Sequence, residues 1–473
     1  MIRAVLFSCL AGSFFFSTFA SANPFDYYAR RMLRQHHAFV EQSLLVTKAH
    51  SYQQATFDQR INHDDPTDTR TFAQRYYVDE TYASGTNPPV VFYVCGEAAC
   101  EFSEVQSSTQ NIASELKAVV IGLEHRYYGP SQPFSSLTTE NLQYLSIDQA
   151  LEDIAAFQDF IDSTKSYSKK WLVMGGSYPG TLSAYFREQY PQRTVGSLAS
   201  SAPVRAKESF EEYDGYVTKV VGPTCAQAMR NVVTQVENSL GDATAVQNIK
   251  AMFQVPQLQD NDDLLMLLAD VGATAAQYGF QTEFCADLQS SKPLQGYANF
   301  AQKVYQLFQV SPIDMTIQGT FSTDPKDYPT LGMRAWQYQA CTQYGFDQIA
   351  NPDPSQSVRS ARLDLAYFRG VCQRAFGLTT PPAIDATNQR YYEPLFNAVT
   401  DHILFTNGSD DPWSTLGLTT PQSLQGNAGL TTYVIQGGSH CTDLYPTSSG
   451  DSSSLQGARQ LFLNLATGWM QAP

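Results

Sequence analysis

A serine, a histidine and two aspartates that lie far apart in the chain are the residues whose types and settings could support covalent chemistry. Ser177 lies in the stretch WLVMGGSYPG, where a short apolar run stops at two glycines. Asp410 and Asp411 follow the apolar run HILFTNG, and His440 follows the run TTYVIQGG. A serine hydroxyl becomes a good nucleophile when an imidazole takes its proton, and a buried carboxylate must hold that imidazole in one tautomer. These residues predict acyl transfer by a Ser-Asp-His triad.

The residues around Ser177 resemble the turn G-x-S-x-G, in which a strand ends in a strained turn and a helix begins at once. Pro179 replaces the second glycine of this pattern. Proline is tolerated in the first turn of a helix, because its missing N–H would have no partner there. The N–H of Tyr178 is retained, and we expect it to form half of an oxyanion hole. The alternative is a glycine-rich turn whose serine only caps a helix.

The order of these residue types along the chain supports the triad. In hydrolases with this turn, the acid follows the serine and the histidine follows the acid. Of the seven histidines, only His440 follows both aspartates. His402 precedes both acids, and we expect a structural, hydrogen-bonded role for His125. Asp410 and Asp411 remain rivals, because the proline after Asp411 does not choose between them.

Strand-like and helix-like segments alternate in most of the chain. Near-continuous apolar runs rich in Val and Ile predict strands that are covered on both faces. They span residues 89–96, 117–126, 171–176, 194–204, 402–408 and 431–438. Helical patterns lie between them, for example at 146–162, with a Ser-x-x-Gln start, and at 180–190. This alternation predicts an α/β fold with a largely parallel sheet, and the turn at Ser177 makes it an α/β-hydrolase fold.

The middle of the chain has a different pattern. Strand-like runs disappear and helix-forming stretches such as DDLLMLLADVGATAAQYGF take over. We therefore expect a helical cap domain at 206–384, inserted between the first part (23–205) and the second part (385–473) of the hydrolase domain. The insert also contains four of the cysteines.

Composition and the amino-terminal residues indicate an exported globular protein. Hydrophobic residues make up 43% of the chain and the net charge is −15, which argues against disorder and against a nucleic-acid partner. Residues 1–22 have the pattern of a signal peptide, with Arg3 before an apolar run and small residues before the cut. The alternative is a membrane anchor, but the run is short, and no other stretch is apolar enough to span a membrane.

Export permits disulfides. Eight cysteines are present, and removing Cys9 with the signal peptide leaves an odd number, so at least one is unpaired or joins another chain. No pair of Cys-x-x-Cys or His-x-x-x-His spacings indicates zinc, and we expect no metal or other cofactor.

Several motifs make the chain resemble the S28 family of serine peptidases, which includes prolyl carboxypeptidase, dipeptidyl peptidase II and the thymus-specific serine protease. The similar stretches run in the family's order across most of the mature chain. They are EHRYYGPSQPF (124–134), GGSYPGTLSAYFREQYP (175–191), SSAPV (200–204), WQYQACTQYGF (336–346), NGSDDPWSTLG (407–417) and GGSHCTDLYP (437–446). The Ser-His-Cys sequence in the last stretch looks more like the thymus-specific branch.

The resemblance implies roles for particular residues. It implies that Ser177 is the nucleophile, His440 the base and Asp411 the acid, and that the helical insert caps the active site. It also implies a disulfide between Cys341 and Cys372. We further expect the pairs Cys225–Cys285 and Cys95–Cys100, which leave Cys441 unpaired and without a nucleophilic role.

The family cleaves peptides after proline, and releases either the last residue, as a carboxypeptidase, or an amino-terminal dipeptide, as a dipeptidyl-peptidase. The resemblance implies that Gly96, in a loop altered from the family's pattern, completes the oxyanion hole. It also implies that Trp413 and Phe346 line the substrate pocket, although both could be ordinary core aromatics. We expect a secreted or lysosomal enzyme that acts on peptide substrates. We also expect that this enzyme can form a homodimer. The alternatives are a lipase or esterase on the same fold, or a non-catalytic binding homologue.

Overall fold

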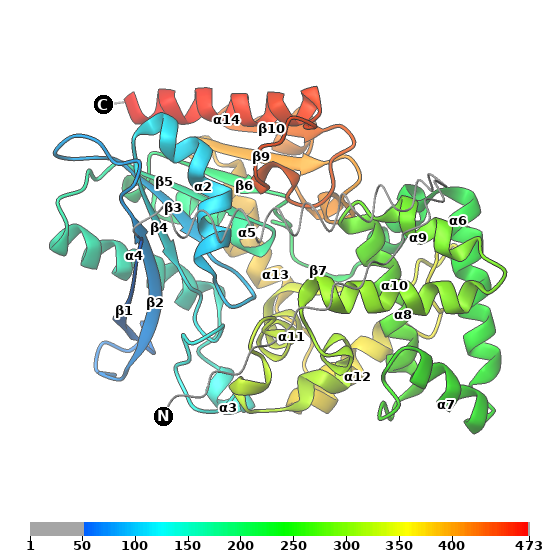
Figure 1. Cartoon of the computed structure of the whole chain (residues 1–473). Helices are drawn as coiled ribbons and strands as arrows, with labels where there is room; N and C mark the ends of the chain where they lie inside the picture. The colour runs from blue at the N-terminus through cyan, green and yellow to red at the C-terminus, as the bar shows by residue number, and fades with distance from the viewer. Residues whose placement is uncertain (1–51, 472–473) are drawn as a thin grey trace, which may run out of the picture. The chain divides into compact units, whose positions relative to one another are not determined.

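An eight-stranded sheet in the order β1-β2-β4-β3-β5-β6-β9-β10 lies at the centre of the fold (Figure 1). The structure is a computed structural model that describes residues 52–471. In this order, each strand from β4 to β10 runs parallel to the next, whereas β2 pairs antiparallel with both β1 and β4. Their bounds are β1 Tyr52–Arg60, β2 Thr71–Asp79, β3 Val90–Val94, β4 Val119–Leu123, β5 Trp171–Gly176, β6 Gly196–Ser200, β9 Ile403–Gly408 and β10 Leu430–Ile435.

The six strands predicted from apolar runs are all present, and the prediction of an α/β fold with a largely parallel sheet is confirmed. The sequence analysis missed β1 and β2. β1 is a mostly polar edge strand with the sequence YQQATFDQR, so it lacks the continuous apolar run by which the other strands were recognised. The expected signal peptide lies outside the described residues.

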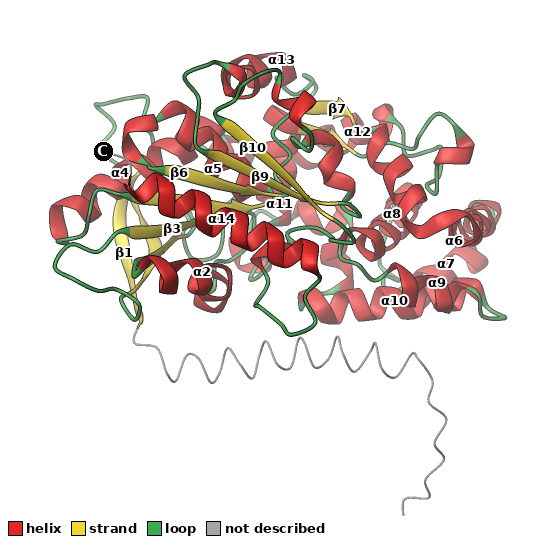
Figure 2. Cartoon of the chain, turned by 90° about the horizontal axis from the view of Figure 1, so that it is seen from above, coloured by secondary structure: helices red, strands yellow, loops and turns green. Residues whose placement is uncertain are grey.

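Two layers of helices cover the sheet, one on each face. On one face, α4 (Ile147–Thr164) and α5 (Tyr178–Gln189) pack on alternate strand residues such as Phe92. On the other face, α2 (Phe102–Leu116) and α14 (Ser453–Gln471) pack on the intervening residues such as Val91; Figure 2 looks onto this side of the sheet. Because successive side chains of a strand point to opposite faces, both faces of the central strands are apolar. The short helix α3 (Thr139–Leu142) precedes α4.

The segment between β6 and β9 is mostly helical (Figure 1). Its helices are α6 (Glu211–Ser239), α7 (Ala243–Met252), α8 (Asn261–Gln277), α9 (Gln281–Leu288), α10 (Pro293–Phe308), α11 (Met333–Gln339), α12 (Leu365–Phe376) and α13 (Ile384–Thr387). The expectation that this segment has no strands is wrong at two short elements, β7 (Lys207–Ser209) and β8 (Gly345–Asp347), which pair as a separate two-stranded sheet. Strands of three residues are too short to show a hydrophobic pattern.

Three disulfides form, and they are the pairs expected from the sequence: Cys95–Cys100, Cys225–Cys285 and Cys341–Cys372. The second joins α6 to α9, and the third joins α12 to the turn that follows α11. Within residues 52–471, Cys441 is the free cysteine. Over the same residues, none of the helices combines the length and the apolar character needed to cross a membrane.

Candidate active site

Ser177 lies alone between the end of β5 and the start of α5, at the carboxyl end of a central strand. Its backbone has φ 60° and ψ −131°, a strained conformation for a residue other than glycine. Ser177 is partly exposed, whereas every residue in 171–176 and 178–187 is buried. The turn therefore holds one side chain out of an otherwise buried stretch, residues 171–187.

The small residues around Ser177 are required by close backbone contacts. A Cβ atom on Gly175 would lie 2.6 Å from the backbone carbonyl of Pro179. One on Gly180 would lie 2.8 Å from the carbonyl oxygen of Ser200 in the neighbouring strand. Pro179 occupies the first turn of α5, where a proline removes no helical hydrogen bond. The departure from the G-x-S-x-G pattern therefore leaves the turn intact.

A hydrogen bond joins His440 to Asp411. His440 Nδ1 lies 2.8 Å from Asp411 Oδ2, and both side chains are buried. The other carboxylate oxygen of Asp411 accepts a bond from the backbone N–H of Trp413 at 3.0 Å. Asp410 points elsewhere and accepts from the Ser409 hydroxyl at 3.0 Å. Of the two rivals, Asp411 is therefore the aspartate in contact with His440.

The sheet brings the loop of His440 beside the turn of Ser177. Parallel strands β5, β6, β9 and β10 are neighbours in that order, so the loops after them meet at one edge. The backbone N–H of Cys441 donates to Ser201 Oγ at 2.9 Å. A Cβ atom on Gly176, directly before Ser177, would lie 2.8 Å from Cys441 Sγ. The serine turn and the histidine loop are thus in van der Waals contact.

A second carboxylate holds the histidine loop on the strand ends. Asp443 accepts from the hydroxyl of Ser200 at 2.5 Å, at the end of β6, and from that of Thr406 at 2.7 Å, in β9. The sequence analysis did not select these residues, because single hydroxyls inside apolar runs have no distinctive pattern.

Burial and charge have opposite effects on His440. Burial disfavours the imidazolium, but the Asp411 carboxylate and the adjacent Cys441 side chain together outweigh this effect, so the pKa of His440 lies well above its usual range. The neutral imidazole that a general base requires therefore forms as the pH rises. Burial raises the pKa of the Cys441 thiol, which keeps it protonated and disfavours a nucleophilic role.

The loop after β3 lies against the first turn of α5. A Cβ atom on Gly96 would be only 2.3 Å from Pro179 Cγ, so only glycine permits this approach. The N–H of Tyr178 belongs to the first turn of α5, where N–H groups have no acceptor within the helix. The two residues expected to form the oxyanion hole are therefore placed beside the same turn.

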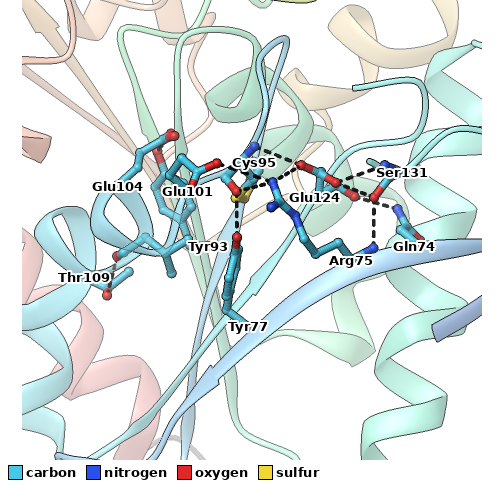
Figure 3. The surroundings of a disulfide bond; sticks show 12 residues. Gln74, Arg75, Tyr77, Tyr93, Cys95, Glu101, Glu104, Thr109, Glu124 and Ser131 are labelled. Carbon is cyan, nitrogen blue, oxygen red and sulfur yellow. Dashed lines mark hydrogen bonds and ion pairs between the residues drawn. A yellow bond between two sulfur atoms is a disulfide. The ribbon is translucent and has the colours of Figure 1, made fainter. Parts of the chain in front are cut away.

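The Cys95–Cys100 disulfide closes this loop, and Figure 3 shows Cys95 with Arg75, Tyr77 and Glu124 around the disulfide. The carbonyl oxygen of Cys100 accepts from Arg75 Nη2 at 2.6 Å and from the Tyr77 hydroxyl at 3.0 Å. Its N–H donates to Glu124 Oε1 at 3.0 Å, and Glu124 also accepts from Arg75 at 2.6 Å. One end of the loop is therefore held by a buried ion pair and the other by β3.

Replacing both Cys95 and Cys100 with serine is expected to lower kcat by roughly 10-fold, because a mobile Gly96 would weaken one oxyanion donor. This loss is smaller than the loss of about 100- to 1,000-fold in kcat that follows when one donor is removed completely. KM should change little, because the aromatic residues expected to bind the substrate lie in other segments. Steady-state kinetics on a peptide reporter measure both constants, and circular dichroism checks the fold. An unchanged kcat in a folded variant would contradict a role for this loop in catalysis.

Aromatic rings form a wall beside the serine turn. The Tyr178 ring lies 5.5 Å from Trp336 and 5.7 Å from Tyr344. Tyr344 stacks on Phe346 at 5.2 Å, and Phe346 lies 5.3 Å from Trp413. Phe346 has a positive φ of 59°, a strain that is common at functional sites. The wall connects the two residues expected in the pocket, and it adds Trp336 and Tyr344, which the sequence analysis did not select.

His125 is buried behind this wall. Its Nε2 lies 2.8 Å from the Tyr178 hydroxyl and its Nδ1 lies 2.8 Å from the carbonyl oxygen of Arg126. Burial lowers its pKa to about 4, so the ring is neutral at physiological pH. This geometry agrees with the structural, hydrogen-bonded role expected from the sequence. In the part of the chain that the structure describes, no group of three or more His, Cys, Asp or Glu side chains could hold a metal ion.

The sheet order and the strained serine turn at the end of β5 define an α/β-hydrolase fold, as predicted. The chain belongs to the family described as serine carboxypeptidase S28, which it matches over residues 59–462. It is a serine-type peptidase.

Similar proteins from a plant and from mammals are named as serine proteases or as a carboxypeptidase. The chain is 35% identical over 378 residues to the protein named "Probable serine protease EDA2" of Arabidopsis thaliana. The aligned region covers 76% of this chain and 74% of the relative. It is 30% identical over 455 residues to the thymus-specific serine protease of Homo sapiens, with 88% and 86% covered. It is 26% identical over 447 residues to the lysosomal Pro-X carboxypeptidase of Bos taurus, with 87% of each chain covered.

Proposed function

We propose that this protein is a secreted or lysosomal serine exopeptidase that cleaves peptide bonds after proline through an acyl-enzyme on Ser177. The observation that carries the proposal is the bond between His440 and Asp411, in a loop that contacts the serine turn. Membership of the S28 family supports the reaction class. The three disulfides and the lysosomal relative support an exported protein.

Each member of the triad has one role in this mechanism. Ser177 Oγ attacks the carbonyl carbon of the scissile bond while His440 Nε2 takes the hydroxyl proton. Asp411 holds the ring through Nδ1 and stabilises the imidazolium that forms. The imidazolium then gives its proton to the departing amine, and an acyl-enzyme remains. Water, activated by the same imidazole, releases the acid and regenerates Ser177.

Backbone N–H groups stabilise the charge that develops on the substrate oxygen. In this proposal the donors are Tyr178 N–H, at the positive amino end of α5, and Gly96 N–H. Both are backbone groups, so neither changes its orientation during the reaction. The helical segment 206–384 acts as a cap over this site.

The aromatic wall supports a preference for proline. Proline presents a compact apolar ring with no N–H in a peptide bond, and aromatic faces provide rigid apolar contact area for such a ring. Trp413 and Phe346 lie in contact in this wall, and both are largely buried. The name of the relative Pro-X carboxypeptidase points to the same preference.

Product analysis on a short peptide library tests the proposal. Peptides with proline at successive positions, each with free or blocked ends, are incubated with the enzyme and the products are identified by mass spectrometry. We expect cleavage only after proline near one end, and blocking that end should abolish it. If blocking the carboxyl end of the peptide abolishes cleavage, the enzyme is a carboxypeptidase. If blocking the amino end abolishes cleavage, it is a dipeptidyl-peptidase. Hydrolysis of a long-chain ester without any peptide cleavage would contradict the proposal in favour of a lipase.

A further inference from the structure

One residue of the helical segment contacts both loops that carry the expected acid and base. Gln277 is the last residue of α8. Its side-chain oxygen Oε1 accepts from Trp413 Nε1 at 3.0 Å and from the Tyr213 hydroxyl at 2.7 Å. Its backbone carbonyl oxygen accepts from the N–H of His440 at 2.9 Å. The acid turn, the histidine loop and α6 therefore meet at a single glutamine.

The orientation of this amide is determined by its partners. The indole of Trp413 can only donate a hydrogen bond, so the atom that faces it must be the oxygen of Gln277. That oxygen has two lone pairs, and Trp413 and Tyr213 use both. Tyr213 is buried and Trp413 nearly so, so both donors would lose their partner if the oxygen were removed.

Trp413 transmits this contact to the acid. Its backbone N–H is bound to Asp411 Oδ1, and its ring centroid lies 6.5 Å from that of His440. The ring also packs at 5.3 Å on both Phe346 and Tyr213. A tilt of the indole would therefore disturb Asp411 and the pocket wall together.

The end of α8 also supports His440 directly. The carbonyl groups in the last turn of a helix have no partner within the helix and carry partial negative charge. The Gln277 carbonyl is one of them, and it accepts a hydrogen bond from the His440 N–H. The Tyr278 ring meets the His440 ring edge-on at 6.1 Å between centroids. Negative charge at this helix end favours the imidazolium form that His440 adopts during the proposed reaction.

We infer that Gln277 is a positioning residue. Through it, the helical segment fixes the positions of Trp413, Asp411 and His440 relative to one another. The inference rests on the proposed function, because it assigns a role in the same reaction. It implies that the segment is a fixed part of the active site and that displacing the end of α8 inactivates the enzyme.

Methionine and glutamate variants at position 277 separate positioning from bulk. Gln277→Met keeps the length of the side chain but removes the acceptor, and we expect roughly a 10- to 100-fold loss of kcat/KM on a prolyl peptide reporter. Gln277→Glu keeps an acceptor for both donors and should recover most of that loss. The matched control is Gln235→Met, at an exposed position of α6. This variant should behave like the wild type.

A double-mutant cycle tests the route through Trp413. Trp413→Phe removes the indole donor but keeps an aromatic ring, and Gln277→Met should cost several-fold less in this background than in the wild type. Circular dichroism shows whether Gln277→Met folds. If it does not, the activity of Trp413→Phe is the test, because losing the indole donor alone should also lower kcat. The rate at which a fluorophosphonate labels Ser177 should follow kcat across these variants.

The outcomes distinguish this inference from the proposed function. A wild type that labels and cleaves, together with a folded Gln277→Met variant of unchanged kcat/KM, would overturn the inference alone. Equal losses in the methionine and glutamate variants would also overturn it, because the acceptor would then be irrelevant. A wild type that neither labels nor cleaves would overturn both.

Discussion

Ser177→Ala is expected to lower kcat on a prolyl peptide reporter by about a million-fold, because removing the nucleophile of a serine peptidase costs about this much. Ser177 is the one residue between positions 171 and 187 that is not buried, so alanine should leave the fold unchanged. Reporter hydrolysis measures the loss, and thermal unfolding checks stability. The melting temperature should stay within a few degrees of the wild type.

Covalent labelling provides an independent measurement. A fluorophosphonate probe should label the wild type at Ser177 and should leave Ser177→Ala unlabelled. Ser107→Ala is the control, since this hydroxyl on α2 donates to the carbonyl of Glu104 within its own helix, and it should label and cleave normally. A wild type that resists the probe would support a non-catalytic binding protein, and labelling of Ser177→Ala would place the nucleophile elsewhere.

Asp411→Asn is expected to lower kcat by about 10,000-fold, because an amide leaves the histidine in the wrong tautomer. Asp410→Asn should change kcat by less than roughly threefold, because this neighbour bonds only to Ser409 among its side-chain contacts in the described residues. The pair is a matched comparison of adjacent positions with identical chemistry. Comparable losses in the two variants, measured at one saturating substrate concentration, would contradict the assignment of Asp411.

The pH profile reports the same contact. The Asp411 carboxylate raises the pKa of His440, and the imidazole must be neutral to act as a base. kcat/KM of the wild type should therefore rise with pH through the pKa of His440 and be lost at lower pH. Without the carboxylate the pKa of His440 falls, so the residual activity of Asp411→Asn should have its acid limb at a lower pH. An acid limb at an unchanged pH would mean that another group controls the profile.

The elements that position the site were largely predictable from the amino-acid sequence. Parallel strands that are covered on both faces must be almost wholly apolar, and this made β3, β4, β5, β6 and β9 visible as runs. The edge strand β1 was missed because it is mostly polar. β2 lies between β1 and β4 and was missed because polar residues such as Gln74 and Arg75, although buried, interrupt its apolar run. The serine turn was recognisable because its glycines are required within six consecutive residues.

The sequence by itself determined the local features of this protein: the strained turn at Ser177, the order of serine, acid and histidine, and the alternation of strands and helices. These depend on residues that are close together in the chain, where backbone geometry restricts what fits. Only the tertiary structure decided that Asp411 and not Asp410 contacts His440, and that Gln277, Asp443 and Tyr344 contact the residues around the serine turn and the histidine loop. Such contacts join residues that are far apart in sequence, and they depend on side-chain directions that are fixed when the sheet and the helical segment pack together.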